Sequence, residues 1–413
     1  QCGECLNVCP VYDLFKREEY APKAKRLLME PLDAEYGSGT EEALAWDTIR
    51  ELSRLCAGCG RCQRACARKL STADLLADAR ARNPHWSQAL WELWIQRLGP
   101  LWPMAGKIAM LAPDGIIPRS LHSLLGTARA LVDLPPCEPW MLLQPQERVE
   151  QTPVVLFSGC TANNARPRWI EKAEKLLKFW GYDVLDASGF TCCGGTLHHA
   201  GQYKAQKSAR DQNVDVWRSL GRPLVASFCA SCKHSLDSYT AVLSAEEGKE
   251  WKQKCVGLSS LLVEPQASQN AMIPAAIGYH QPCHWGTADP DLPLLKSWLP
   301  GLQKGTGLCC GMGGILKMSN PDLSADMARK CMEGFAPEVR QIITGCSGCV
   351  MQLASVAGEN RQVRHWFDYI FGTPVSDVFF AGVSSLAFCE DGSLVAEAVL
   401  DAVTPIRRTP SFM

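Results

Sequence analysis

The chain has 413 residues, 46% hydrophobic and 21% charged, as in a globular protein of two or three domains. Its 42 Lys and Arg nearly balance 43 Asp and Glu, which excludes the overall basic field used to bind nucleic acid. The 21 cysteines are clustered rather than spread as in a disulfide framework. We therefore expect reduced thiolates that bind metal in a cytoplasm-like compartment. We find no apolar run of 18 or more residues that would span a bilayer.

Residues 1–82 carry two cysteine runs. The first, QCGECLNVCP, has the spacing C-x2-C-x3-C-P. The second has the full C-x2-C-x2-C-x3-C spacing of a [4Fe–4S] site, with Ala67 where proline is usual. Zinc suits separated C-x2-C pairs but does not need this spacing twice over, so iron–sulfur is favoured. The first run lacks one cysteine, which we expect just before Gln1.

The two runs predict two cubane [4Fe–4S] clusters, because the fourth cysteine of each run in a two-cluster ferredoxin ligates the other cluster. The first cubane is expected on Cys2, Cys5 and Cys66 plus the residue before Gln1. The second is expected on Cys9, Cys56, Cys59 and Cys62.

Residues 11–30 and 41–55 have helical spacing of apolar residues, so a helical insertion is predicted between the two runs. Lys23, Lys25 and Arg26 in this insertion are predicted to form a solvated face. The insertion makes residues 1–82 a largely helical, ferredoxin-like domain with a truncated start.

Residues 83–150 form a predicted helical connector that is rich in tryptophan. It contains Trp86, Trp91, Trp94 and Trp102, and Trp91 and Trp94 share a helical face. These side chains are predicted to pack between domains; the alternative is a docking surface for a membrane partner. Cys137 lies in the linker that follows and has no predicted role.

From residue 151 the chain repeats itself. Each copy alternates apolar strands with helices, and its cysteines follow the strands, at the edge where α/β sheets bind ligands. The interval from Cys193 to Cys229 is 36 residues, as is the interval from Cys310 to Cys346. The repeat predicts two like α/β domains, 151–270 and 271–372, most simply related by a pseudo-twofold axis. The first cysteine set is Cys160, Cys192, Cys193, Cys229 and Cys232; the second is Cys283, Cys309, Cys310, Cys346 and Cys349.

These two sets resemble the CCG-domain iron–sulfur proteins, typified by the B and D components of heterodisulfide reductase. Iron–sulfur subunits of glycolate oxidase and anaerobic glycerol-3-phosphate dehydrogenase are similar, and the resemblance covers nearly the whole chain. It implies that each complete set binds a non-cubane [4Fe–4S] cluster at which disulfides are reduced. Both closing C-x2-C pairs are intact, which favours the heterodisulfide-reductase-like branch, whereas CCGGTLHHAG and VRHWFDYI also look like the glycolate oxidase protein.

Four histidines stand beside the two cysteine sets. His280 and His284 flank Cys283, while His198 and His199 follow the first Cys-Cys pair. Histidine titrates in the range needed to supply protons, so we predict these four as proton donors. The alternative is a structural hydrogen bond to backbone or to a cluster sulfur.

Together these features predict the iron–sulfur subunit of a respiratory complex. It would move electrons between an integral-membrane quinone or cytochrome b subunit and a thiol/disulfide couple, while attached peripherally to the cytoplasmic side of the inner membrane. The alternative is a relay for a flavoprotein subunit that oxidises a 2-hydroxy acid such as glycolate or lactate. Residues 373–413 are predicted to be a tail, and three cysteines outside the motifs are predicted to be inert: Cys255, Cys331 and Cys389.

Overall fold

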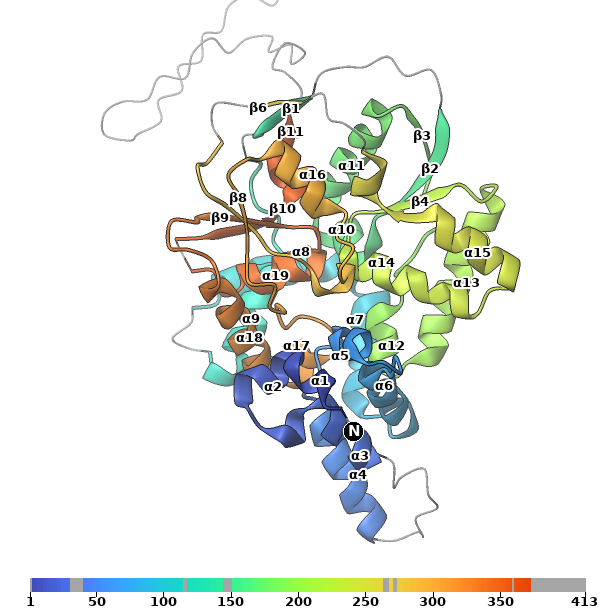
Figure 1. The fold of residues 1–413 in the computed structure, drawn as a ribbon, viewed down its shortest axis with the longest axis vertical. Coiled ribbons are helices and arrows are strands. Elements are labelled where there is room, and N and C mark those ends of the chain that lie inside the picture. The colour runs from blue at the N-terminus through green and yellow to red at the C-terminus, as the bar shows by residue number, and fades with distance from the viewer. Residues whose placement is uncertain are drawn as a thin grey trace, which may run out of the picture. The chain divides into compact units, whose positions relative to one another are not determined.

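Two four-stranded parallel sheets organise the part of the chain that the structure describes (Figure 1). The structure is a computed structural model and describes residues 2–29, 40–113, 117–137, 139–143, 151–262, 267–269, 273–358 and 360–372. Residues 1–372 form one compact unit. The predicted tail, with Cys389, lies outside the described residues.

The first sheet follows the connector and is built from apolar runs. Its strands pair in the order β3-β2-β4-β5, all parallel: β2 (Thr152–Phe157), β3 (Tyr182–Leu185), β4 (Leu224–Ser227) and β5 (Cys255–Gly257). Residues 154–157 of β2 are at most 1% exposed, as expected for a parallel strand covered on both faces. The helical elements that follow these strands are α10 (Gly159–Ala165), α11 (Pro167–Phe179), α12 (Gly195–His199), α13 (Tyr203–Ser219), α14 (Ala230–Asp237), η4 (Ser238–Ala241), α15 (Ala245–Lys254) and η5 (Leu258–Leu261).

The second sheet repeats this arrangement. Its strands pair in the order β10-β9-β7-β8, again all parallel: β7 (Ile277–Tyr279), β8 (Leu302–Lys304), β9 (Gln341–Thr344) and β10 (Gln362–His365). The helical elements that follow are η6 (Cys283–Trp285), α16 (Asp291–Trp298), α17 (Leu316–Ser319), α18 (Pro321–Glu333), α19 (Ser347–Ala354) and α20 (Trp366–Tyr369).

Both sheets share one topology. In each sheet the second strand along the chain lies at an edge, and next to it come the first, the third and the fourth strand in that order. This order is β3-β2-β4-β5 in the first copy and β8-β7-β9-β10 in the second. The order reverses between the first and third strands, and ligands of open α/β sheets bind at such a reversal, beyond the carboxyl ends of the strands. The predicted α/β class is therefore confirmed for both copies.

The regular secondary structure in the described part of residues 2–82 is helical, and most of the helices are short. Those between the cysteine runs form the predicted insertion, and α6 begins at an N-cap where the Ser71 hydroxyl accepts the Asp74 N–H at 3.1 Å. The elements are α1 (Glu4–Asn7), α2 (Pro10–Phe15), η1 (Glu18–Tyr20), α3 (Pro22–Met29), α4 (Thr40–Ser53), α5 (Arg61–Ala65) and α6 (Thr72–Arg82).

The tryptophan-rich connector is also helical. Trp94 and Trp102 stack with ring centroids 5.8 Å apart, and Trp102 is buried, which is the predicted packing role. Trp86 is 70% exposed, and the Trp91 side chain lies outside the description. The connector contains α7 (Trp86–Gln96), η3 (Gly99–Leu101), α8 (Trp102–Leu111) and α9 (Arg119–Arg129).

A third, small sheet is formed by three short strands from distant parts of the chain. They pair in the order β11-β1-β6 and are β1 (Met141–Leu143), β6 (Ala267–Gln269) and β11 (Ile370–Gly372).

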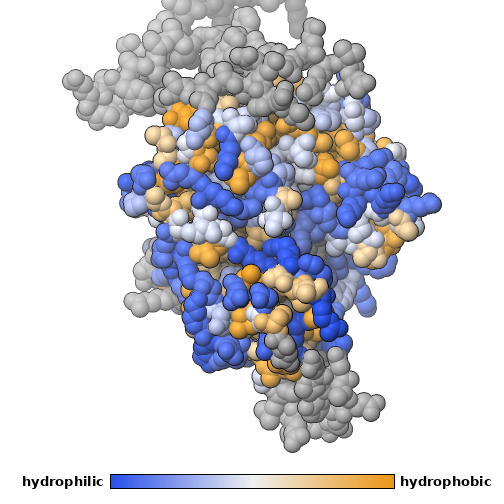
Figure 2. Space-filling view, in the orientation of Figure 1, coloured by the Kyte–Doolittle hydropathy of each residue, from blue (hydrophilic) through white to orange (hydrophobic). Residues whose placement is uncertain are grey.

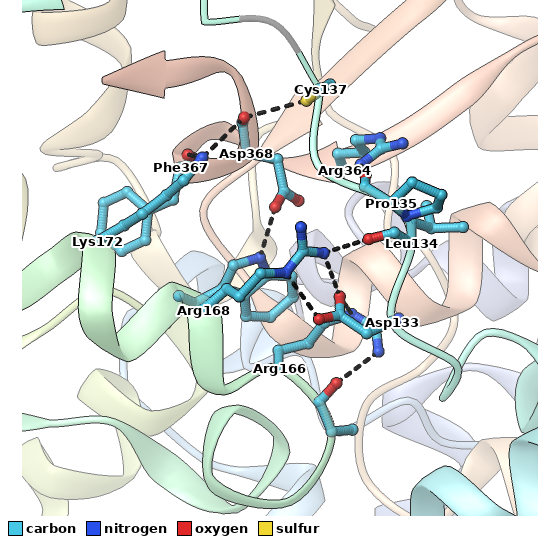
Figure 3. A network of polar contacts seen from close by, with 12 residues as sticks. Asp133, Leu134, Pro135, Cys137, Arg166, Arg168, Lys172, Arg364, Phe367 and Asp368 are labelled. Atoms are coloured by element: carbon cyan, nitrogen blue, oxygen red, sulfur yellow. Dashed lines mark hydrogen bonds and ion pairs between the residues drawn. The ribbon is translucent and has the colours of Figure 1, made fainter. Parts of the chain in front are cut away.

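A network of polar contacts joins the connector to α11 and α20 (Figure 3). Arg168 binds both carboxylate oxygens of Asp133, at 2.9 and 2.7 Å. Lys172 and the thiol of Cys137 both donate to the backbone carbonyl of Asp368, at 2.9 and 3.0 Å. The bidentate ion pair and the shared carbonyl hold together the connector, α11 and α20, which are far apart in sequence.

The surface of the described residues has no continuous apolar band on the face shown in Figure 2, where hydrophobic areas are scattered among hydrophilic ones. No helix in the described ranges is long and apolar enough to cross a membrane. The helix α8 does carry exposed apolar side chains, including Met104, Ile108 and Leu111 at 53%, 61% and 84% exposure.

Candidate iron–sulfur centres

Two cysteines of each set stand at the carboxyl ends of the strands that flank the reversal in each sheet. Cys160 and Cys229 follow β2 and β4, and Cys283 and Cys346 follow β7 and β9. The second member of each closing C-x2-C pair lies in the first turn of the next helix, α14 or α19. Strand ends and helix starts thus bring each set together, where backbone N–H groups can stabilise thiolate charge.

The first cysteine set forms a continuous group of thiols. The thiol of Cys192 interacts with the thiols of Cys160 and Cys193, and the thiol of Cys193 interacts with that of Cys232. Cys232 is in turn in contact with Cys229. The close approach requires a glycine, because a Cβ at Gly159 (φ 76°) would lie 2.7 Å from Cys232 Sγ.

The second cysteine set is assembled in the same way. The sulfurs of Cys310 and Cys349 are 3.3 Å apart, and those of Cys309 and Cys283 are 4.0 Å apart. Cys346 contacts Cys349, and Cys309 contacts Cys310. All ten cysteines of the two sets are free thiols, so no disulfide competes with metal binding among them.

The two sets meet each other. Cys229 of the first set is in side-chain contact with Cys346 of the second. Cysteines of both sets line one cavity of about 1440 Å³, which also reaches α6, the connector and α12. A single chamber therefore gives access to both groups of thiols.

The second cubane set is also brought together. Cys9, Cys56, Cys59 and Cys62 line one small cavity of about 30 Å³. Burial raises the pKa of the Cys9 thiol to about 12, so the thiolate form requires a bound cation that displaces the proton. The Cys59 thiol also interacts with the Cys309 thiol of the second cysteine set, so the two sites adjoin.

The first cubane set lies nearer the surface. Cys2 is exposed, and Cys5 interacts electrostatically with Cys62 and Cys2. Cys66 follows α5, where hydrogen bonds from the backbone amides of Leu70 and Arg68 lower the pKa of its thiol.

Lys25 corrects the prediction of a solvated face. Its side chain is only 2% exposed, lines the small cavity and donates to the Leu55 carbonyl at 2.6 Å. Burial lowers its pKa, while the neighbouring thiols of Cys56 and Cys9 raise it. Helical periodicity could not identify this lysine, because its burial comes from the cysteine loop that closes over α3.

The four predicted proton donors occupy different environments. His198 lines the large cavity and is 3.0 Å from Asp74, whose hydrogen bond raises the pKa of the imidazole. Burial lowers the pKa of His199 to about 3 and also lowers that of His284. His280 is buried behind the second cysteine set and is not among the described residues that line the cavity.

Both ring nitrogens of His284 are engaged. Nε2 is 3.1 Å from the Gly58 carbonyl, and Nδ1 is 2.9 Å from the Ser231 hydroxyl. That hydroxyl is also 3.1 Å from Cys346 Sγ. The contact with the Gly58 carbonyl is a structural hydrogen bond to backbone, which is the alternative to proton donation. Through its two ring nitrogens, His284 of the second α/β copy links the loop around Gly58 to Ser231 of the first copy.

Sequence reasoning missed three residues that belong to these sites. Asp74 lies in no motif, and Ser231 is a non-cysteine position of the first closing C-x2-C pair; both reach their partners only through tertiary contacts. Cys331, predicted to be inert, has its sulfur 3.3 Å from His280 Nδ1. No local signal marks these residues, since their partners are between 51 and 124 residues away.

The burial and convergence of these thiols fit iron–sulfur clusters, and comparisons with known proteins agree. The model of the 4Fe-4S dicluster domain matches residues 1–70, and the model of the cysteine-rich domain CCG matches residues 154–237 and 300–354. The chain is a CCG-domain iron–sulfur protein. It therefore binds [4Fe–4S] clusters, in a dicluster domain followed by CCG domains.

Several curated proteins are similar to this CCG-domain protein over most of its length. The glycolate oxidase iron-sulfur subunit of Escherichia coli K12 is 23% identical, over 89% of this chain and 92% of its own. The D component of the dihydromethanophenazine:CoB–CoM heterodisulfide reductase of Methanosarcina acetivorans is 24% identical, over 79% and 80%. The B component of the CoM/CoB fumarate reductase of Methanothermobacter marburgensis is 24% identical, over 86% and 66%.

Proposed function

We propose that this chain is the iron–sulfur subunit of a membrane-associated respiratory oxidoreductase at which a thiol/disulfide couple reacts. Two cubane clusters and one or two non-cubane clusters would supply one-electron carriers and an iron that a substrate sulfur can reach. The cubane cysteines are those of the N-terminal runs, and the two cysteine sets hold the non-cubane clusters. A pseudo-twofold relation between the two CCG copies is part of this proposal.

The observation that carries the proposal is the single cavity onto which both cysteine sets open. Reduction of a disulfide takes two electrons and two protons and yields two thiols, so it is favoured where two one-electron donor sites adjoin one chamber. The contact between Cys229 and Cys346 brings the two sets together at that chamber. A volume of about 1440 Å³ is ample for a small disulfide beside the metal groups.

The protons come from the side of the cavity formed by α6 and α12. Among the four histidines, we favour His198 as the donor, because Asp74 raises its pKa and so keeps the imidazole charged nearer neutral pH. The Asp74 side chain is 55% exposed, and its hydrogen bond also fixes the orientation of the ring. His284 remains in the proposal as a residue that orients neighbouring backbone through its contact with the Gly58 carbonyl.

The electron partner in this proposal is an integral-membrane quinone or cytochrome b subunit. The exposed apolar side chains of α8, Met104, Ile108 and Leu111, support a contact with such a partner. This arrangement would attach the chain peripherally to the cytoplasmic side of the inner membrane.

The test is low-temperature EPR on anaerobically purified, oxidised protein of known iron content, before and after thiols are added. The proposal predicts a new paramagnetic signal induced by the thiol, and about 16 irons per fully loaded chain, four per cluster. Cubane signals that thiols leave unchanged, at full iron content, would contradict the disulfide chemistry.

A second candidate is a relay for a flavoprotein subunit that oxidises a 2-hydroxy acid. The observation that favours it is the similarity to the Escherichia coli glycolate oxidase iron-sulfur subunit, which spans 92% of that protein. This candidate predicts no thiol-induced signal and rapid reduction of the clusters by a flavoprotein that carries the hydroxy acid.

A further inference from the structure

The pair formed by His280 and Cys331 lies behind the second cysteine set and has no role in the function proposed above. Both side chains are 2% exposed. A ring nitrogen of His280 and the sulfurs of Cys310 and Cys349 all lie within 4.8 Å of one another, which is a spacing that one metal ion can bridge. A buried imidazole thus completes a group of nitrogen and sulfur donors.

The hydrogen bonds of this pair identify the nitrogen that is free. Cys331 Sγ donates to the Leu308 carbonyl at 3.8 Å and is 3.3 Å from His280 Nδ1. Because a carbonyl only accepts, the thiol proton is directed there, and the sulfur accepts from Nδ1–H. The other nitrogen, Nε2, then carries the lone pair, is buried and has no hydrogen-bond partner among the described residues.

The backbone fixes this arrangement. The N–H of His280 donates to the Ile343 carbonyl of β9 at 2.9 Å, so the residue extends the pairing of β7 with β9. Cys331 lies in α18, which packs against α19, the helix that carries Cys349. A rigid strand end and a helix therefore hold the imidazole, as occurs for histidine ligands whose second nitrogen is hydrogen-bonded.

The first copy has no equivalent of this pair. Phe157 stands three residues before Cys160, as His280 stands three before Cys283. Val214 follows Cys193 at the interval by which Cys331 follows Cys310. Phe157 is fully buried and packs on Phe190, so an apolar pair replaces the polar one.

We propose that His280 is a nitrogen ligand of the metal centre on the second cysteine set, oriented by Cys331. The two CCG sites are then chemically unequal, with five thiolates at the first and five thiolates plus an imidazole at the second. This inference rests on the proposed function in so far as the second set holds a cluster.

The experiment uses the full-length protein purified anaerobically from cells fed ring-¹⁵N-histidine, with pulsed EPR in oxidised and reduced states. The expected result is a ¹⁵N coupling typical of a directly bound nitrogen. His280→Phe, which installs the residue of the first copy, abolishes it. His122→Gln, at an exposed position on α9, leaves it unchanged. Cys331→Val keeps the imidazole but removes its anchor, and is expected to weaken or shift the coupling.

Iron analysis of Cys349→Ser separates the possible failures. If this variant loses iron but the wild type shows no ring-¹⁵N coupling, the histidine ligand is overturned and the proposed function stands. A coupling that persists in His280→Phe overturns it equally. If Cys349→Ser keeps all its iron, the second set holds no cluster, and both the ligand and the disulfide chemistry at this site fail.

Discussion

At the scale of single residues, the main electrostatic feature of the predicted second cubane site is a buried lysine. Lys25 is 2% exposed and has its ammonium on the Leu55 carbonyl, beside the cavity of Cys9 and Cys56. Burying a charge is unfavourable unless an opposite charge is near. A [4Fe–4S] site with four thiolates supplies negative charge, so we attribute the burial of Lys25 to the site that it faces.

We predict that Lys25→Met lowers the reduction potential of the second cubane by on the order of 50 mV, the equivalent of about 1 kcal/mol for one electron. The reason is that the lost positive charge stabilised the reduced, more negative form. A redox titration followed by EPR measures the shift. Lys249→Met, which removes an exposed lysine from α15, is the matched control and should leave the potential unchanged. Equal potentials in wild type and Lys25→Met would contradict this role.

At the scale of elements, two loops pack backbone to backbone. A Cβ at Gly313 would lie 2.3 Å from the Ala57 carbonyl oxygen, so the loop after Cys310 rests on the second cubane loop. Arg64 of α5 donates to the carbonyls of Cys59 and Cys283, at 3.2 and 3.0 Å, and so bridges the cubane loop to the second CCG copy. Glycine is therefore required at position 313 because the backbone of Ala57 lies so close, in addition to any role beside a cofactor.

We predict that Gly313→Ala separates these loops and lowers the free energy of unfolding by about 1–3 kcal/mol, because a methyl group is forced against backbone. The measurement is an anaerobic urea titration in which cluster absorbance reports iron release. Gly195→Ala adds the same methyl group where the nearest atoms, those of Ser235, are 3.3 Å away, and should be milder. Identical urea midpoints for the two variants would show that the loops are not held by this contact.

At the scale of the molecule, packing is unevenly distributed. One large core joins both sheets and includes buried Trp169, Trp217, Trp251, Trp298 and Trp366. The ferredoxin-like segment has only small clusters among its described residues, and its helices α1, α2 and α5 have four, six and five residues. Helices this short are not stable alone, so the iron–sulfur clusters must supply much of the order there.

We predict that removing iron with a chelator under anaerobic, reducing conditions raises amide hydrogen exchange mainly in residues 2–29 and 47–70. The amides of β2, β4, β7 and β9 should stay largely protected, because the core around these strands is built mainly from large buried apolar side chains that iron removal leaves in place. Hydrogen exchange with mass spectrometry measures both, and refilling with iron and sulfide should restore protection. A uniform loss of protection would mean that the clusters stabilise the whole unit to the same extent.

Much of the site follows from local sequence. The spacing of Cys56, Cys59 and Cys62 predicts a cluster because three thiolates and one iron–sulfur cube impose that geometry on a short loop. The strand ends at Cys160 and Cys283 are predictable too, since apolar runs that stop at a cysteine in an α/β repeat place it at the ligand edge. The proposed ligands of the cubane and non-cubane clusters rest on these two patterns, the cysteine spacing and the cysteines at strand ends.

The amino-acid sequence by itself determined the repeat, the α/β class and the cysteine runs, because these depend on spacing along one stretch of chain. Only the tertiary structure decided that Cys229 meets Cys346, that Lys25 is buried and that His280 and Cys331 pair behind the second set. Those outcomes depend on how separate segments pack. Contacts between residues 30 or more positions apart leave no periodic trace in either segment.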